Sequence, residues 1–148
     1  MDCDEIAYYY SLWFYSRPTD IGSATKNAFS ILGEPGQPIH AFRAKISARQ
    51  LNYTSTSNGS LMRTTPLAVW LSGSQLSPDQ VYDAVKADAA FVHTNEIVSQ
   101  AIWYYHLAIQ YLLNNPTEPD RAKKAFDLVY EYSRVHIFRN IKPIKAIR

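Results

Sequence analysis

Two loops of this sequence combine small residues with side-chain hydrogen-bond donors, each directly ahead of a predicted helix. The first reads Thr-Asp-Ile-Gly-Ser over 19–23, and the second reads Ser-Thr-Ser-Asn-Gly-Ser over 55–60. Exposed backbone N–H groups at such junctions, assisted by the positive end of the helix dipole, suit phosphate or pyrophosphate oxygens. Gly and Ser are also ordinary turn and capping residues, so a purely structural role for both loops stays open.

The chain is predicted to be helical nearly throughout, so helices must position these loops. Asp2 or Asp4 is a candidate N-cap for a first helix that Pro18 ends, and a second short helix is expected over 23–32 with Gly33 as its C-terminal stop. No segment alternates apolar and polar residues over the length of a strand between turn signals. A further helix is expected over 40–51, and two more begin at the cap-then-Pro signals Thr65-Pro66 and Ser77-Pro78. A long helix is expected from a cap at Thr94 or Asn95 to the 114–116 stop, and another opens at 117–120.

The last two helices have the clearest periodicity, because their apolar residues recur at three- and four-residue spacing and so share one face. These residues are Val98, Ala101, Ile102, Tyr105, Ile109 and Leu112 in the first of the two, and Ala122, Ala125, Phe126 and Val129 in the second. We therefore predict an all-α fold, a compact orthogonal multi-helix domain with six or seven helices.

Length and composition restrict the class of protein. A chain of 148 residues with 47% hydrophobic and 19% charged residues is long and apolar enough for one domain with a core. The net charge of +2 does not favour nucleic acid or an anionic membrane as a partner, and we expect neither. Cys3 is the only cysteine, which excludes an intramolecular disulfide, and the apolar run 6–15 is too short to span a bilayer. An intracellular, cytoplasmic location is the expectation.

Three motifs in order resemble the signatures of the ADP-ribosylglycohydrolase family, which includes the J1 crystallins. One is Asn-Gly-Ser-Leu-Met-Arg over 58–63, followed by Thr-Thr-Pro-Leu-Ala over 64–68. Upstream, Asp-Ile-Gly-Ser-Ala-Thr over 20–25 is similar to the family's Asp-Ile-Gly-x-x-Thr segment. Downstream, Val-His-Thr over 92–94 is similar to its Thr-His turn before a long helix. The resemblance runs from about Asp4 to about Leu113 and corresponds to the central portion of the family.

The resemblance implies an all-helical hydrolase that removes ADP-ribose from proteins or related acceptors. It implies that Asp20 is catalytic and that Gly22 and Ser23 approach the ribose near the scissile bond, although the family often has Asn in place of Ser23. A carboxylate there would accept hydrogen bonds from ribose hydroxyls or steady an oxocarbenium-like transition state. The alternative for Asp20 is an Asx turn or a helix N-cap.

The resemblance also implies a binding surface for the rest of ADP-ribose. It assigns substrate binding to the loop residues Ser57, Asn58, Gly59 and Ser60, and to His93 on the ribose or phosphate side of the same cleft. Without the family, His93 would be a capping or hydrogen-bonded structural histidine.

Other histidines and Arg63 are left outside the predicted site. His40, His106 and His136 have no partner at metal-ligand spacing, so we interpret them as structural. Arg63 could bind phosphate or could anchor the loop by donating to its carbonyls.

The family uses a pair of divalent metals, so the resemblance implies Mg²⁺ as cofactor. Its members hold the metals with a Thr-Asp-Asp segment upstream of the region matching 4–15 and with an Asp-x-Asp-Ser/Thr segment near the C-terminus. This sequence contains neither. The acids Asp2, Asp4 and Glu5 are read as helix caps, so no metal ligand is assigned and hydrolysis by this chain alone is expected to be slow or absent.

The expectation is therefore one truncated family domain over 1–148 that begins and ends inside a family-sized unit. Its end, 134–148, is a basic amphipathic tail that either docks on a partner or starts the family's next helical layer. Two functions stay open. In the first, the chain is part of a metal-dependent hydrolase acting on ADP-ribosylated protein, either as a fragmentary gene product or completed by another polypeptide. In the second, it is a metal-free ADP-ribose-binding or structural protein.

Overall fold

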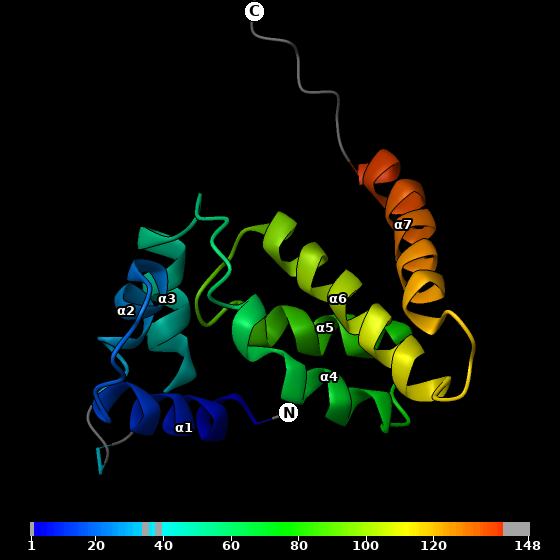
Figure 1. Cartoon of the computed structure of the whole chain (residues 1–148). Helices are drawn as coiled ribbons and strands as arrows, with labels where there is room; N and C mark the ends of the chain where they lie inside the picture. The colour runs from blue at the N-terminus through cyan, green and yellow to red at the C-terminus, as the bar shows by residue number, and fades with distance from the viewer. Residues whose placement is uncertain (1, 34–35, 38–39, 141–148) are drawn as a thin grey trace, which may run out of the picture.

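The computed structural model describes residues 2–33, 36–37 and 40–140. Within them the chain is all-α, as predicted, and no strand occurs. The elements are α1 (Cys3–Tyr15), α2 (Ser23–Phe29), α3 (Ala41–Leu51), the short 3₁₀ helix η1 (Leu61–Arg63), α4 (Thr65–Ser72), α5 (Pro78–Ala89), α6 (Glu96–Asn114) and α7 (Arg121–Asn140) (Figure 1).

Several helix starts follow the capping signals of the sequence. Asp2 is the N-cap of α1 and accepts from the backbone N–H groups of Asp4 and Glu5. Ser77 caps α5 in a capping box with Gln80. The other candidate N-cap, Asp4, serves a different helix, because its Oδ1 accepts from the N–H of Ala41 at 2.7 Å and thereby caps α3 from a neighbouring element.

Two predicted boundaries were wrong. The helix expected over 23–32 ends at Phe29, because the next residues tighten into a turn in which the Leu32 N–H donates to the Phe29 carbonyl. Gly33 follows with a φ of 104°, a left-handed conformation that favours glycine. At α4 the cap is Thr64 and not Thr65, so Thr65 and Pro66 both lie inside the first turn.

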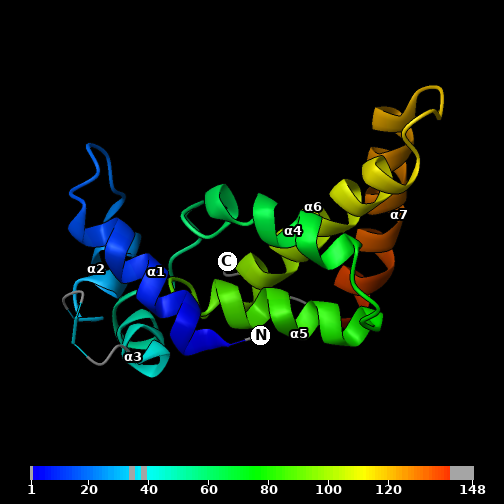
Figure 2. The same cartoon turned by 90° about the horizontal axis from the view of Figure 1, so that it is seen from below.

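The helices form two groups, which both views show side by side (Figures 1 and 2). Helices α1, α2 and α3 pack around a cluster that contains Phe29, Leu32 and several alanines, whereas α4, α5 and α6 enclose Leu71, Val85 and Ile102. Small residues in the first cluster allow close approach of its short helices.

The last two residues of α5 and the turn that follows them, residues 88–93 and here called the 88–93 turn, connect the two groups. Although it follows α5, its Phe91 and Val92 are fully buried in the cluster of the α1–α3 group. The Asn52 side-chain amide donates to the carbonyls of Ala24 at 2.8 Å and Val92 at 2.9 Å. These contacts hold the turn against α2, so the 88–93 turn belongs to both groups.

Helix α7 packs along α6, but fewer of its apolar residues are buried in this contact than the sequence predicts. Ala125 is buried, but Phe126 is 67% exposed, so the predicted shared face does not coincide with the packed one. A helix that rests mainly on one neighbour buries only a thin stripe. Of the predicted basic tail 134–148, residues 141–148 lie outside the described residues.

No helix in the described part of the chain is long and apolar enough to cross a bilayer.

Candidate functional site

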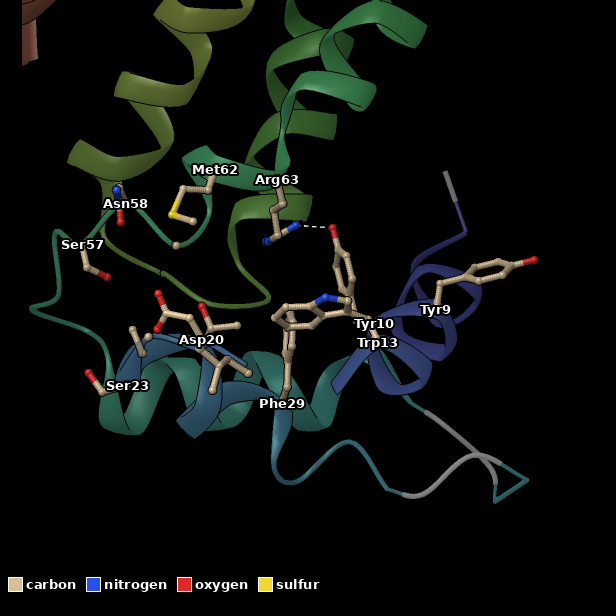
Figure 3. A pocket seen from close by; sticks show the side chains of 15 residues that line it. Tyr9, Tyr10, Trp13, Asp20, Ser23, Phe29, Ser57, Asn58, Met62 and Arg63 are labelled. Atoms are coloured by element: carbon tan, nitrogen blue, oxygen red, sulfur yellow. Dashed lines mark hydrogen bonds between the residues drawn. The ribbon is translucent and has the colours of Figure 1, made fainter. Parts of the chain in front are cut away.

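A pocket of about 610 Å³ opens between the two groups of helices, and we call it the Asp20 pocket. One wall comes from α1 and α2, and the other comes from the 57–63 segment (Figure 3). Its lining residues include six of the predicted site residues, namely Asp20, Gly22, Ser23, Ser57, Asn58 and Gly59. Segments more than thirty positions apart in sequence therefore meet at one cavity.

The Asp20 carboxylate is exposed and points into the pocket between the 57–58 loop and the Trp13 ring (Figure 3). Among the described residues that line the pocket, it is the only acidic side chain. The alternative of a helix N-cap does not apply to it, because Gly22 is the N-cap of α2. Its carboxylate thus faces the pocket, where both oxygens are hydrogen-bond acceptors.

Two predicted site residues, Ser60 and His93, lie behind the pocket wall. Both are fully buried and absent from the lining. The His93 Nε2 lies 2.9 Å from Ser57 Oγ and its Nδ1 lies 2.8 Å from Ser60 Oγ. His93 is therefore placed where it supports the loop from beneath, and it reaches the pocket only through Ser57.

The protonation of this His93 cluster, His93 with Ser57 and Ser60, follows from its partners. The Ser60 hydroxyl donates to the Ala89 carbonyl at 3.3 Å, so we assign the ring proton to Nδ1, which donates to the Ser60 oxygen. Nε2 then accepts from the Ser57 hydroxyl. Burial, and next the positive charge of Arg63, lower the pKa of His93, which keeps the ring neutral at neutral pH.

Gly59 is needed where the loop crosses α2. A Cβ at this position would lie 2.7 Å from Thr25 Oγ1 and 3.6 Å from the His93 ring. The first distance is too short for a side chain without movement of one of the two segments. The glycine thus lets the loop approach α2 and close the pocket.

The sequence interpretation missed a charged cluster at the other end of the 57–63 segment. Arg63 Nη1 donates to both carboxylate oxygens of Asp88 at 2.7 and 2.6 Å, and Nη2 donates to the Asp88 carbonyl at 2.8 Å. Tyr10 of α1 completes it, since its hydroxyl donates to Asp88 Oδ1 at 2.7 Å and it also contacts Arg63. Burial raises the pKa of Tyr10.

This charged cluster, Arg63 with Asp88 and Tyr10, attaches the 57–63 segment to α5 and α1, whereas the sequence offered a phosphate ligand or a donor to carbonyls of its own loop as the alternatives for Arg63. Its guanidinium lines the pocket, but its terminal nitrogens point to Asp88 and Tyr10. One signal could have found it: Asp88 lies at helical spacing from the core residues Val81 and Val85, and an acid on an apolar face needs a partner.

An aromatic wall, also missed from sequence, borders the charged cluster. Trp13 is 42% exposed and packs edge-on against Phe29 at a centroid distance of 6.2 Å, while Tyr10 stacks on Phe29 at 5.0 Å. Figure 3 shows the Trp13 ring along the pocket opposite Asn58 and Met62, whereas Tyr9 points away. The pocket therefore combines one carboxylate, a small-residue loop and a flat apolar surface.

A comparison with protein families agrees with this geometry. The family model described as ADP-ribosylglycohydrolase matches residues 2–146, nearly the whole chain. The chain belongs to the ADP-ribosylglycohydrolase family. Comparisons with curated proteins and with solved structures found no significant match. The family membership confirms the resemblance seen in the three motifs, and two of these motifs, 20–25 and 58–63, line the Asp20 pocket of this family member.

Magnesium is the metal that the sequence resemblance implies for an ADP-ribosylglycohydrolase. In the described part of the chain, no group of three His, Cys, Asp or Glu side chains is close enough to hold a metal ion. The described lining of the Asp20 pocket offers a single carboxylate, whereas magnesium needs several oxygen ligands. These residues do not fit the metal, so we derive no step through it.

Two other histidines of this family member have structural surroundings. His106 is buried, its Nε2 lies 2.7 Å from Thr64 Oγ1, and burial lowers its pKa to about 4. His40 is exposed at the start of α3, with Nδ1 3.6 Å from Asp4. The side chain of His136 lies outside the described part of the structure.

Proposed function

We propose that the Asp20 pocket binds ADP-ribose and that the chain serves a hydrolase that cleaves the glycosidic bond between ADP-ribose and a protein or small acceptor. One observation carries the proposal: two of the motifs that mark the family, 20–25 and 58–63, line the same cavity. The volume of about 610 Å³ lies within the usual range for ligand pockets.

Each wall of the pocket suits one part of ADP-ribose. Asp20 would accept hydrogen bonds from the hydroxyls of the ribose that carries the scissile bond. The 57–59 loop has no acid, so the backbone N–H groups of Asn58 and Gly59 would bind the diphosphate without repulsion, while the Ser57 N–H donates to Ser55 Oγ. The exposed ring of Trp13 would pack against the flat adenine base.

Cleavage of the glycosidic bond also requires groups that stabilise the transition state. Departure of the acceptor builds positive charge on the ribose ring, and the Asp20 carboxylate would stabilise that charge. We propose that magnesium-dependent hydrolysis also needs ligands from outside the described residues, supplied for example by a complementing chain.

A second candidate is a metal-free protein that binds ADP-ribose or has a structural role. The lack of a metal-ligand cluster among the described residues favours it. The two candidates differ in one measurable property. The first predicts magnesium-dependent release of ADP-ribose once a complementing segment is added, and the second predicts binding that is independent of magnesium.

Isothermal calorimetry with ADP-ribose tests the binding that both candidates share. We expect Asp20→Asn and Asn58→Ala each to weaken binding by about tenfold, the equivalent of one or two lost hydrogen bonds. Asp127→Asn, at an exposed acid of α7 outside the pocket, serves as the matched control and should bind as the unchanged protein does. Equal affinity of all four proteins would place the ligand elsewhere and refute the proposal.

A further inference from the structure

A second cavity, of about 260 Å³, lies between α5, α6 and α7, and we call it the Tyr82 cavity. Among the described residues, it shares no lining residue with the Asp20 pocket. Figure 1 shows these three helices on the side of the molecule away from α1–α3. Its lining comprises Pro78, Asp79, Tyr82, Glu96, Gln100, Trp103, Tyr104 and Tyr132.

Four of the lining residues are aromatic, and they come from all three helices. Tyr82 of α5 and Trp103 of α6 meet edge to face, with ring centroids 5.8 Å apart and planes at 78°. Tyr104 of α6 and Tyr132 of α7 add two further rings. The faces of aromatic rings carry partial negative charge and attract cations, and the Lys86 ammonium already lies 5.8 Å from the centroid of the Tyr82 ring.

The charged groups of the cavity lining have the same sign. Asp79 and Glu96 are acidic, and the lining that the structure describes contains no Lys or Arg. Glu96 is partly neutralised, because Lys86 donates to its Oε2 at 2.8 Å and the Tyr82 hydroxyl donates to its Oε1. These two partners lower the pKa of Glu96 and keep it charged.

Asp79 differs from Glu96 in that its carboxylate has no partner among the residues that the structure describes. No hydrogen bond or ion pair reaches it from any residue that the structure describes, so both of its oxygens are available. A neighbouring acid, Asp83, stands one turn further along α5 and adds to the negative potential near Tyr82. The cavity thus has an open two-oxygen acceptor beside a group of aromatic rings.

We propose that the Tyr82 cavity binds a guanidinium group, carried by an arginine side chain or by a free guanidino compound. A guanidinium is planar, stacks on aromatic faces and donates two parallel hydrogen bonds to one carboxylate, which matches both features of this cavity. A quaternary ammonium would use the rings but leave the Asp79 oxygens without a donor. An anion would be repelled by both acids.

The three tryptophans give the full-length protein its own reporters, since Trp103 lines the Tyr82 cavity, Trp13 lines the Asp20 pocket and Trp70 is exposed on α4. In a titration with ethylguanidinium followed by NMR of the indole N–H groups, only the Trp103 signal should move. We expect a dissociation constant on the order of 1 mM. The neutral isostere N-ethylurea should leave all three signals in place.

Two variants separate the proposed contact from general effects. Asp79→Asn should weaken ethylguanidinium binding by about fivefold or more, because the charge-assisted pair is lost. Asp20→Asn, in the other pocket, should leave it unchanged, which also keeps this test independent of ADP-ribose binding. A capped Gly-Arg-Gly peptide then identifies the source: binding tighter than ethylguanidinium indicates a protein arginine, and weaker binding indicates a free guanidino compound.

Three results would each overturn the proposal. The first is an unmoved Trp103 signal at about ten times the expected dissociation constant. The second is N-ethylurea binding as tightly as ethylguanidinium, which would make the cavity merely apolar. The third is tighter binding of tetramethylammonium, or an unaffected Asp79→Asn variant, because either would show that the carboxylate does not select the ligand.

Discussion

The two ends of the 57–63 segment are held by clusters of opposite character. At one end, His93, Ser57 and Ser60 form a neutral hydrogen-bonded cluster. At the other end, Arg63 pairs with Asp88 beneath the Tyr10 hydroxyl. Both clusters attach the segment to the 88–93 turn, but only the charged one also reaches α1. Breaking the charged cluster would therefore leave a buried charge without its partner. Breaking the neutral cluster would remove only uncharged hydrogen bonds and should cost less stability.

The largest effect is expected from breaking the charged end. Asp88→Asn would leave the Arg63 guanidinium, which is only 17% exposed, without its counter-charge. Removing one partner of a buried pair costs about 3–5 kcal/mol, and we expect a loss of that size in the free energy of unfolding measured in urea. Glu131→Gln, which breaks the exposed pair with Arg134, should change it by less than about 1 kcal/mol. Similar losses in both variants would contradict the comparison.

Acidification should lower the stability of the protein through His106, a buried neutral histidine. The pKa of His106 is lowered to about 4 by burial, whereas an unfolded histidine titrates near 6.5. As the pH falls below about 6.5, the unfolded state binds a proton that the folded state does not, so stability decreases toward pH 4. Between about pH 7 and about pH 5 this loss amounts to about 2 kcal/mol.

Urea unfolding of His106→Gln at both pH values checks this expectation. Gln cannot titrate but can still bond Thr64, so the variant should lose clearly less stability on acidification than the unchanged protein. The exposed His40→Gln variant is the control and should keep the full pH dependence. Equal pH dependence of the three proteins would show that His106 is not the responsible group.

The close approach of the loop to α2 can be tested at Gly59. Gly59→Ala places a Cβ 2.7 Å from Thr25 Oγ1, and we expect roughly 1–2 kcal/mol of destabilisation together with weaker ADP-ribose binding. Gly73→Ala is the matched control, since its nearest neighbour is the Trp70 carbonyl at 3.8 Å. Thr25→Ala should relieve most of the Gly59→Ala defect. A defect that persists in the double variant would mean that this clash is not its cause.

The smallest effect is expected at the neutral end. Ser57→Ala removes one hydrogen bond from His93, but the serine is exposed, so water can replace it and the cost should be about 0.5–1.5 kcal/mol. Ser60→Ala should cost more, because Ser60 is fully buried and leaves His93 Nδ1 without an acceptor. Thermal unfolding of the two variants gives the ranking. The reverse order would show that the exposed contact carries the cluster.

The motif residues show how far sequence reasoning reached for the site. The family, the all-α class and the caps at Asp2, Ser77 and Asn95 follow from local patterns that need no knowledge of distant residues. The loops 19–23 and 55–60 were candidates for anion binding because small residues and donors ahead of helices suit an anion, while a purely structural role stayed open. The roles assigned to Asp20 and to the loop residues stay predictions until ligand binding is measured.

Only the tertiary structure decided which side of the pocket wall each residue occupies. The sequence determined that 58–63 and 92–94 belong to one family pattern, but it could not reveal that His93 lies beneath the loop, since burial depends on how α2 and the 88–93 turn pack. The pairing of Arg63 with Asp88 and Tyr10 likewise joins positions up to 78 residues apart. Local propensity acts over a few residues, whereas such contacts form only when separate helices come together in the folded chain.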